Sequence, residues 1–153
     1  MMKAPPAAPP LSLRAAIVNG PLTPQAEADV LSLVSGAGGS GLAGAVLRFE
    51  GVVRRNEADQ DRGGALRPLA ALNYQTYDPM AQRELESLAR GVAERHGLRS
   101  IAALHSRGRV RVGEVSFVLI VTAAHRAEAI AGLTEFIDQM KQDVPIWKRP
   151  VWA

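Results

Sequence analysis

Four basic residues near the C-terminal end of the chain lie at or near the two ends of one predicted helix. They are His125 and Arg126 at its start, Lys141 in its last turn, and Lys148 just beyond it. Backbone N–H groups already create positive potential at a helix start, so cations there are electrostatically unfavourable and need another reason. An anion bound in this region is the simplest single reason for all four. The alternative is that Lys141 only complements the helix dipole and that the His-Arg pair is solvated.

The same cations suit two kinds of chemistry, and Arg54 and Arg149 add to them. Phosphate recognition favours the fork of an arginine, with lysine acting as a point charge. Acyl transfer needs a cation or N–H donors where an oxyanion develops. A lysine close to other cations also loses its proton more readily, so it can serve as a base or nucleophile near neutral pH. Lys141 and Lys148 are the two candidates for that role.

Residue types exclude or disfavour several other chemistries. The chain has no cysteine, which excludes disulfides, cysteine-ligated zinc and any cysteine nucleophile or persulfide on this chain. Its three histidines, His96, His105 and His125, lack metal-ligand spacing and clustered carboxylates, so no metal site is predicted. No Gly-x-Ser-x-Gly segment supports a serine hydrolase. If the protein handles sulfur, the sulfur must arrive on another molecule.

Composition favours a single domain that binds a small anion. The 153 residues fit one domain, and 47% are hydrophobic. A net charge of +3 with 5% aromatic residues suits an anionic small molecule or an acidic partner and falls short of a nucleic-acid footprint. Residues 1–10 are proline-rich and predict a disordered tail, which leaves 11–153 as the domain. The longest apolar run, 117–121, is too short to cross a membrane, so a cytoplasmic protein is expected.

The helix between the cations is predicted from about Ala127 to Lys141. Its apolar residues have the 3-4-3 spacing of one helical stripe: Ile130, Leu133, Ile137 and Met140. Pro145 forbids helix at its own position, and Gly132 is the one candidate break. Residues 115–122 are nearly all apolar, which predicts a central strand leading to the helix. Trp147 is more typical of a core residue than of a ligand platform.

The other strands and loops are predicted from period-two patterns and turn residues. Strands are expected at 11–18, 43–53, 69–77, 101–105 and 109–112. Residues 36–41 match G-x-G-x-x-G, but a helix precedes them and a strand follows, so a flexible loop is predicted instead of a dinucleotide site. Residues 56–67 are polar and predict a mobile surface loop. Helices and strands mixed without strict β-α-β order favour an α+β fold.

Two further helices are predicted from their capping residues. Thr23-Pro24 suits the N-cap and first position of a helix that runs to about residue 34. Asp78-Pro79 suits the same two positions of a second helix, which Gly97 closes. The second helix has the 4-3-4 apolar spacing of a buried stripe and is predicted to be structural throughout.

Four segments carry a resemblance to a known family. They are Phe49-Glu50-Gly51-Val52-Val53-Arg54, Tyr74-Gln75-Thr76-Tyr77-Asp78-Pro79-Met80, His105-Ser106-Arg107-Gly108-Arg109-Val110-Arg111-Val112-Gly113-Glu114, and Ala124-His125-Arg126 with Lys141 and Pro145-Ile146-Trp147-Lys148-Arg149. In this order and spacing, over about Gly44 to Arg149, they resemble the large, catalytic subunit of molybdopterin synthase. No single segment is decisive, whereas four in the right order are specific.

The resemblance implies a fold, a reaction and a partner. The fold is α/β hammerhead-like, with a mixed or antiparallel sheet and flanking helices. The reaction is sulfur transfer to cyclic pyranopterin monophosphate, which forms the dithiolene of molybdopterin in molybdenum cofactor biosynthesis. The sulfur comes from the C-terminal Gly-Gly thiocarboxylate of a small ubiquitin-like carrier subunit, whose tail enters the large subunit. The lack of cysteine agrees with such an external donor, and no metal or other cofactor is implied.

The resemblance also carries the family's substrate-binding residues onto this sequence: Val52, Val53, Arg54, His125, Arg126, Lys141, Lys148, Arg149 and Pro150. In this assignment Lys141 is the main catalytic lysine. Lys148 is the second and holds the substrate or the acyl intermediate. Arg54, His125 and Arg126 neutralise the phosphate.

Several positions depart from the family pattern. Pro150 stands where an acidic residue usually follows Trp-Lys-Arg, and the sequence ends three residues later, so the end of the pocket is expected to be open or incomplete. Asn73 and Gln75 replace residues that are commonly acidic, and Ser106 replaces a common arginine. These departures leave two alternatives. One is a non-catalytic interaction subunit on the same fold, and the other is a binding module for a nucleotide or another phosphate.

Helix length constrains the assembly. Arg126 and Lys141 are fifteen residues apart, or about 22 Å at the rise of an α-helix, and a pterin phosphate spans only about half of that. Unless the helix breaks at Gly132, both ends can serve one site only if they come from two chains. A two-fold homodimer within a heterotetramer is therefore predicted, in which His125 and Arg126 of one subunit complete the pocket that holds Lys141 and Lys148 of the other. The alternative is that His125 and Arg126 only cap or solvate the helix start.

Overall fold

The computed structural model describes residues 10–28, 32 and 41–153. Most of the predicted tail over 1–10, most of the first predicted helix beyond residue 28 and most of the glycine-rich segment 36–41 lie outside the described residues. Residues 24–28 are helical, and the Thr23 hydroxyl accepts a hydrogen bond from the Ala26 N–H at 3.3 Å. The predicted start of this helix is therefore confirmed.

The described strands form one mixed sheet of seven strands. They are β1 (Ser12–Asn19), β2 (Ala45–Val52), β3 (Asn56–Asp59), β4 (Ala65–Thr76), β5 (Ser100–Arg111), β6 (Val115–Ala123) and β7 (Ile146–Trp152). The order along the main path is β2-β6-β5-β4-β3, while β1 pairs with β5 and β7 pairs with β4. Only the β1–β5 pair is parallel among these described pairs. The predicted α+β class is confirmed.

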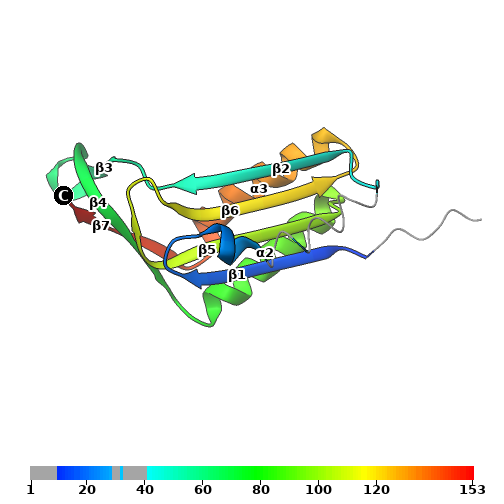
Figure 1. Cartoon of the computed structure of the whole chain (residues 1–153), viewed down its shortest axis with the longest axis horizontal. Coiled ribbons are helices and arrows are strands. Elements are labelled where there is room, and N and C mark those ends of the chain that lie inside the picture. The colour runs from blue at the N-terminus through cyan, green and yellow to red at the C-terminus, as the bar shows by residue number, and fades with distance from the viewer. Residues whose placement is uncertain (1–9, 29–31, 33–40) are drawn as a thin grey trace, which may run out of the picture.

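The long strand β5 changes its neighbour along its length and so divides the sheet into two parts. Its residues 100–107 pair with β1, and its residues 108–111 pair with β4. As a result β3, β4 and β7 project beyond the end of the main sheet (Figure 1). This arrangement agrees with the hammerhead-like fold. The sequence predicted two strands here, over 101–105 and 109–112, but the structure has one continuous strand.

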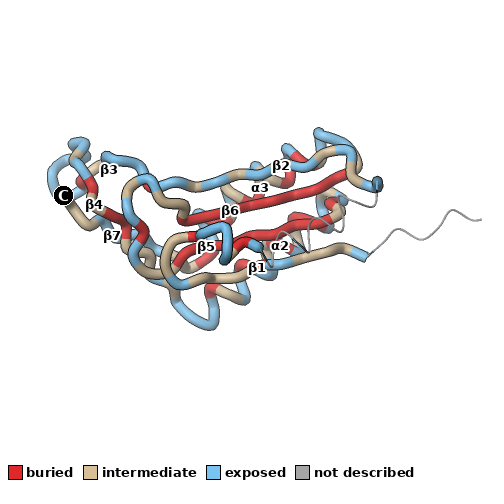
Figure 2. Tube along the Cα trace, viewed as in Figure 1, coloured by how far each residue is buried: buried red, intermediate tan, exposed pale blue. Residues whose placement is uncertain are grey.

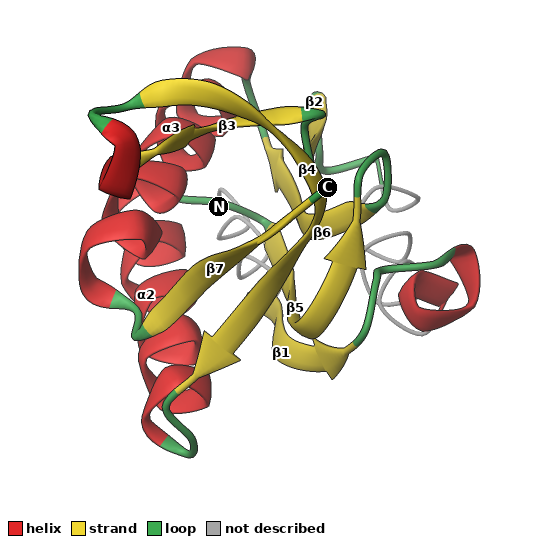
Figure 3. Ribbon diagram, turned by 90° about the vertical axis from the view of Figure 1, so that its left-hand side faces the viewer, coloured by secondary structure: helices red, strands yellow, loops and turns green. Residues whose placement is uncertain are grey.

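Two helices, α2 (Met80–His96) and α3 (Arg126–Asp143), pack side by side on one face of the main sheet (Figure 3). The core lies between them and the strands, and its fully buried side chains include Leu85, Phe136, Ile101 and Leu119. The buried stretches run along β5 and β6 (Figure 2). Eight of the nine residues of β6 are buried, which confirms the predicted central strand over 115–122.

The core-facing side of α3 differs from the predicted stripe. The buried residues of the helix are Ala129, Gly132, Phe136 and Met140, whereas Ile130 is 52% exposed. Gly132 does not break the helix. A Cβ built there would lie 3.2 Å from both terminal carbons of Leu98, so the glycine lets α3 approach that side chain closely. Gly132 faces Leu98 and His96 at the end of α2. The large Phe136 is fully buried, and Leu133 and Ile137 are partly buried against the same core.

The predicted surface loop over 56–67 is wrong. These residues form β3, the 3₁₀ helix η1 (Gln60–Arg62) and the start of β4, which together make an antiparallel hairpin. The Asp59 carboxylate accepts hydrogen bonds from the Asp61 N–H at 3.1 Å and from Arg67 at 2.9 Å. The Arg67 guanidinium lies 4.7 Å from the ring centre of Trp152 in β7. The hairpin was not predicted because its residues are polar. The Asp59–Arg67 ion pair and the Arg67–Trp152 contact stabilise it, and it has no alternating apolar residues that would indicate a strand.

The start of α2 also differs from the prediction in detail. The helix begins at Met80 with Pro79 as the N-cap residue, so Asp78 does not cap it. The Asp78 carboxylate instead accepts hydrogen bonds from Thr76 and Arg107. Gly97 closes the helix in the left-handed conformation with φ 62°, as predicted.

Gly44→Ala is expected to lower the free energy of unfolding by about 1–3 kcal/mol, because the new methyl group has no room. A Cβ at this position would lie 2.2 Å from the backbone oxygen of Ala124, just beyond the end of the β2–β6 pairing. Gly91→Ala in α2 is the matched control. Its Cβ would meet only the flexible end of Arg95 at 3.0 Å, and alanine is the better helix former by about 1 kcal/mol. Urea unfolding of both variants measures the contrast, and equal stability would contradict the close approach.

Glu135→Gln is expected to destabilise the protein at neutral pH and much less in acid. The hydrogen bond from His96, and then the Arg95 guanidinium at 2.6 Å, hold the pKa of the Glu135 carboxyl below its usual range. A carboxyl with a lowered folded-state pKa stabilises the fold above its unfolded pKa of about 4.3, and this contribution disappears as the pH falls through the folded value. We expect a loss of about 0.5–1 kcal/mol at pH 7 that shrinks below about pH 4. Urea unfolding across this range measures it, with Glu94→Gln as control, and a loss that does not vary with pH would contradict this role.

Candidate active site

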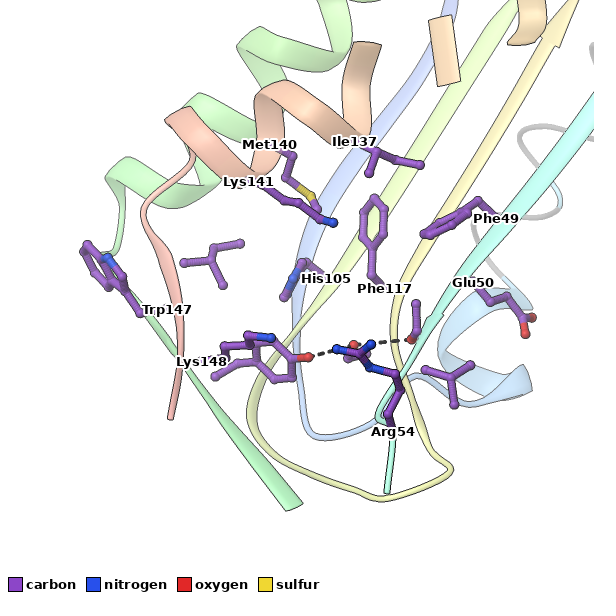
Figure 4. Close-up of a pocket in the computed structure, with 15 residues that line it drawn as sticks. Phe49, Glu50, Arg54, His105, Phe117, Ile137, Met140, Lys141, Trp147 and Lys148 are labelled. Atoms are coloured by element: carbon purple, nitrogen blue, oxygen red, sulfur yellow. Dashed lines mark hydrogen bonds between the residues drawn. The ribbon is translucent and has the colours of Figure 1, made fainter. Parts of the chain in front are cut away.

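A cavity of about 810 Å³ opens where the C-terminal end of α3 meets the two parts of the sheet. Its apolar wall is formed by Phe49 and Phe117 from the main sheet, Ile137 and Met140 from α3, and Ile146 from β7. Three of the predicted cations line it: Arg54, which follows β2, Lys141 in the last turn of α3, and Lys148 in β7. Figure 4 shows these three side chains entering the same space from different sides. Segments far apart in the sequence thus bring their positive charges together.

Glu57 is a contact of this site that the sequence did not reveal. Its carboxylate pairs with Arg54 at 3.4 Å and with Lys148 at 3.2 Å. Its side chain is only 18% exposed, because it lies on β3 in the hairpin. The carboxylate therefore acts as an internal counter-ion that holds two of the three cations at the cavity. The sequence indicates this contact only through the spacing of three residues between Arg54 and Glu57. The polar composition of 56–67 favoured a loop, in which such a pair is not expected to be fixed.

His105 and Tyr74 form a semi-polar part of the wall. His105 is 6% exposed, and its Nδ1 lies 2.8 Å from the backbone oxygen of Ser106. Burial lowers the pKa of His105 and raises the pKa of Tyr74. The Tyr74 hydroxyl donates to Ser116 Oγ at 3.0 Å, and this hydroxyl donates to the backbone oxygen of Gly51 at 3.3 Å. Both side chains are therefore fixed by hydrogen bonds at the cavity.

Trp147 was expected in the core, but it is 56% exposed and lines the cavity. Another exposed apolar residue, Tyr77, lies near it, since Gln75 pairs with Trp147 across β4 and β7 and the Tyr77 N–H donates to the Pro145 backbone oxygen. Tyr77 and Met80 are 60% and 49% exposed. An apolar surface therefore adjoins the entrance of the cavity.

The other residues carried over from the family lie outside this cavity or at its edge. Val52 lines it and is exposed, while Val53 is buried in the small core of the projecting strands. Arg149 donates to the Gln75 side chain at 2.8 Å, so it ties β7 to β4. Pro150 lies opposite Leu72 on β7 and is exposed. Of the residues carried over, the structure thus brings Val52, Arg54, Lys141 and Lys148 to the cavity wall.

His125 and Arg126 are at the far end of α3 from Lys141. The helix is continuous over Arg126–Asp143, so the two ends stay about 22 Å apart. Both side chains are exposed, and neither forms an ion pair with a described residue. Within one chain, these two residues and Lys141 are too far apart to contact one small ligand.

Two other kinds of site have no support in the described part of the chain. It contains no group of three or more His, Cys, Asp or Glu residues that could hold a metal ion. None of its helices combines the length and the apolar character that a membrane span needs.

Comparison with known proteins decides the family. The family model described as MoaE protein matches residues 21–143. The chain belongs to the MoaE protein family. Within this family, the molybdopterin synthase catalytic subunit of Oryza sativa subsp. indica is 38% identical over 110 residues, which cover 72% of this chain and 53% of the rice protein. The chain thus spans about half the length of the curated relatives it matches.

Solved structures give the same fold. A molybdopterin synthase structure from Staphylococcus aureus has a TM-score of 0.69 at 25% identity and covers 90% of both chains. A complex of subunits 1 and 2 of molybdopterin-converting factor from Helicobacter pylori 26695 has a TM-score of 0.67 over 93% of this chain and 90% of that one. Its identity of 22% supports the fold alone. The chain thus shares its fold with these solved structures.

Proposed function

We propose that the single domain over 11–153 is the catalytic subunit of a molybdopterin synthase. In this role it transfers sulfur from the C-terminal thiocarboxylate of a small ubiquitin-like carrier to cyclic pyranopterin monophosphate and so forms the dithiolene. The observation that carries the proposal is the meeting of Arg54, Lys141 and Lys148 at one cavity in a member of the MoaE family. A cysteine-free chain needs its sulfur from a donor of this kind.

The three cations have separate tasks in the proposed reaction. Arg54 binds the phosphate, because a guanidinium fork suits two phosphate oxygens. Lys141 acts as the reacting lysine at the cavity wall, to which Met140 and Ile137 of the same helix also belong. Lys148 stabilises the oxyanion that develops on the oxygen of the carrier's acyl group. Before the substrate binds, Glu57 holds Arg54 and Lys148 close to the cavity.

The carrier is proposed to enter along β7. Among the described strands β7 pairs only with β4, so its other edge is unpaired. An extended tail can add to such an edge through backbone hydrogen bonds. Tyr77, Met80 and Trp147 are exposed apolar side chains, which suit contacts with the body of the carrier. The Helicobacter pylori protein of the same fold is itself found in a complex of subunits 1 and 2 of molybdopterin-converting factor.

Lengthening the carrier tail by one residue beyond Gly-Gly is expected to block sulfur transfer. Only glycine lets a backbone pass as closely as a narrow entrance requires, and one added residue moves the reacting carbon by roughly 3.5 Å. Turnover with native and extended carriers measures this effect, and binding of both carriers is the control. Equal turnover with the extended tail would count against tail insertion.

The assembly is proposed to be a two-fold homodimer, with one carrier bound to each subunit. The unbroken α3 supports it, because His125 and Arg126 of one subunit can complete only another subunit's cavity. A cytoplasmic location also remains a prediction.

Two alternatives have a specific observation behind them. Pro150 at a usually acidic position favours a non-catalytic subunit on the same fold, and the cations alone favour a binding module for a nucleotide or another phosphate. A thermal shift with a nucleotide or inorganic phosphate, and none with the pyranopterin, would favour the module.

The decisive experiment follows the carrier by mass spectrometry. With the pyranopterin precursor present, the protein is expected to convert the carrier's thiocarboxylate to a carboxylate. A non-catalytic subunit would bind the carrier and leave its mass unchanged.

A further inference from the structure

His105 is the buried titratable side chain that the proposed roles of the cations leave unused. It lies in β5 at the wall of the cavity, where it is 6% exposed. Its Nδ1 is 2.8 Å from the backbone oxygen of Ser106. A carbonyl oxygen can only accept, so Nδ1 must carry the proton and donate it. In the neutral ring, Nε2 then has a free lone pair.

The surroundings of the ring favour this neutral state. The Tyr74 ring meets it edge-on with 5.1 Å between ring centres, and the Phe117 ring lies at 5.7 Å. Burial among such groups lowers the pKa of His105. The titratable and charged groups that face it around the cavity are Glu50, Arg54, Tyr74, Lys141 and Lys148. The cations in this set also disfavour a positive charge on the ring, as burial does.

The other proton acceptors near the cavity already have partners. Glu50 pairs with Arg48 at 2.7 Å, and Glu57 pairs with Lys148 at 3.2 Å. Ser116 Oγ accepts from Tyr74 at 3.0 Å. Among the described residues of the cavity wall, His105 Nε2 thus offers a neutral acceptor that is not engaged in an ion pair.

The proposed reaction requires such an acceptor. When the carrier gives up its sulfur, its acyl carbon exchanges the C–S bond for a C–O bond to water. The electron pair of the C–S bond leaves with the sulfur, which stays on the pterin as a thiolate. The attacking water must lose a proton during this step. Arg54 stays protonated and cannot take it, and Lys141 and Lys148 already have other roles in the proposed reaction.

We propose that His105 Nε2 accepts the proton of the water that replaces sulfur at the carrier's acyl carbon. The inference rests on the proposed function. The ring becomes an imidazolium as the C–O bond forms, and it returns the proton to solvent after the carboxylate leaves. No oxidant or reductant takes part, and water is the one added reactant.

Two substitutions separate this role from a structural one. His105→Asn can keep an N–H donor for Ser106 but has no atom at the place of Nε2, whereas His105→Gln can place an amide oxygen there and loses the Nδ1 donor. We expect His105→Asn to lower the rate of carboxylate formation by about 100-fold with carrier affinity unchanged. The wild-type rate should fall in acid as His105 becomes protonated, and this acid limb should be missing in His105→Asn. An Asn variant with the wild-type rate and pH profile, or a loss of rate that follows thermal stability in both variants, would overturn the proposal.

A second measurement does not depend on turnover. In protein labelled with ¹⁵N at histidine, NMR is expected to show a neutral His105 ring with the proton on Nδ1 at pH 7. A proton on Nε2 at this pH would overturn the proposal even if sulfur transfer is confirmed. A wild-type protein without any transfer activity would instead refute the proposed function, and with it the role of His105 in that reaction.

Discussion

Lys141→Ala is expected to abolish sulfur transfer while the protein still folds and binds its carrier. Lys141 occupies the last turn of α3 at the wall of the cavity and is exposed, so its loss opens no core cavity. Removal of a positioned acid-base or nucleophilic group typically costs about 100-fold or more in rate, whereas a surface change shifts stability by under about 0.5 kcal/mol. Single-turnover sulfur transfer and urea unfolding measure the two effects separately.

Two control variants define what the lysine does. Arg83→Ala removes a positive charge from an exposed position of α2 outside the cavity and should leave turnover unchanged. Lys141→Arg keeps the charge, but a guanidinium stays protonated and is no nucleophile. It should therefore be nearly as slow as the alanine variant. Full activity of Lys141→Arg would show that only the positive charge of Lys141 is needed. Full activity of Lys141→Ala would show that Lys141 is not the reacting lysine.

Mixing two inactive variants, Arg126→Ala and Lys141→Ala, is expected to restore activity. If the cavity is shared between subunits, a mixed dimer has one site with both mutations and one site with neither. Random exchange makes half of the dimers mixed, so activity should reach roughly a quarter of the wild-type value. The reason is geometric, because the two residues are about 22 Å apart on one unbroken helix.

The same experiment has clear controls. Each variant alone, carried through the same exchange, must stay inactive, and mass spectrometry of differently labelled subunits must show that mixed dimers form. No recovery under these conditions would contradict the shared site. Arg126→Ala with full activity would show that the start of α3 is only solvated.

The elements with strong hydrophobic patterns were predictable from the sequence. The central strand β6 and the helix α3 were confirmed nearly to the residue. The buried face of α3 was predicted only in part. Leu133, Ile137 and Met140 pack against the core, whereas Ile130 is exposed and the stripe left out Ala129, Gly132 and Phe136. The spacing of apolar residues therefore predicts reliably that a helix is amphipathic. It predicts less reliably which side of the helix is buried.

The site was predictable only where its residues carry charge in a recognisable order. Arg54, Lys141 and Lys148 were found from their type and context, and the structure brings them to one cavity. Glu57 was missed, because its contact with Lys148 joins residues 91 positions apart and its strand is polar. The acceptor character of His105 also depends on burial and on a backbone oxygen, neither of which a sequence pattern encodes.

The most direct test of the proposed function is the yield of molybdopterin per carrier consumed. The protein is incubated with cyclic pyranopterin monophosphate and a defined amount of thiocarboxylated carrier, and molybdopterin and spent carrier are both quantified. Since a dithiolene contains two sulfur atoms, about two carriers should become carboxylates for each molybdopterin formed. Carrier that loses sulfur without molybdopterin, or no loss of sulfur from a carrier that a known synthase uses, would contradict the assignment.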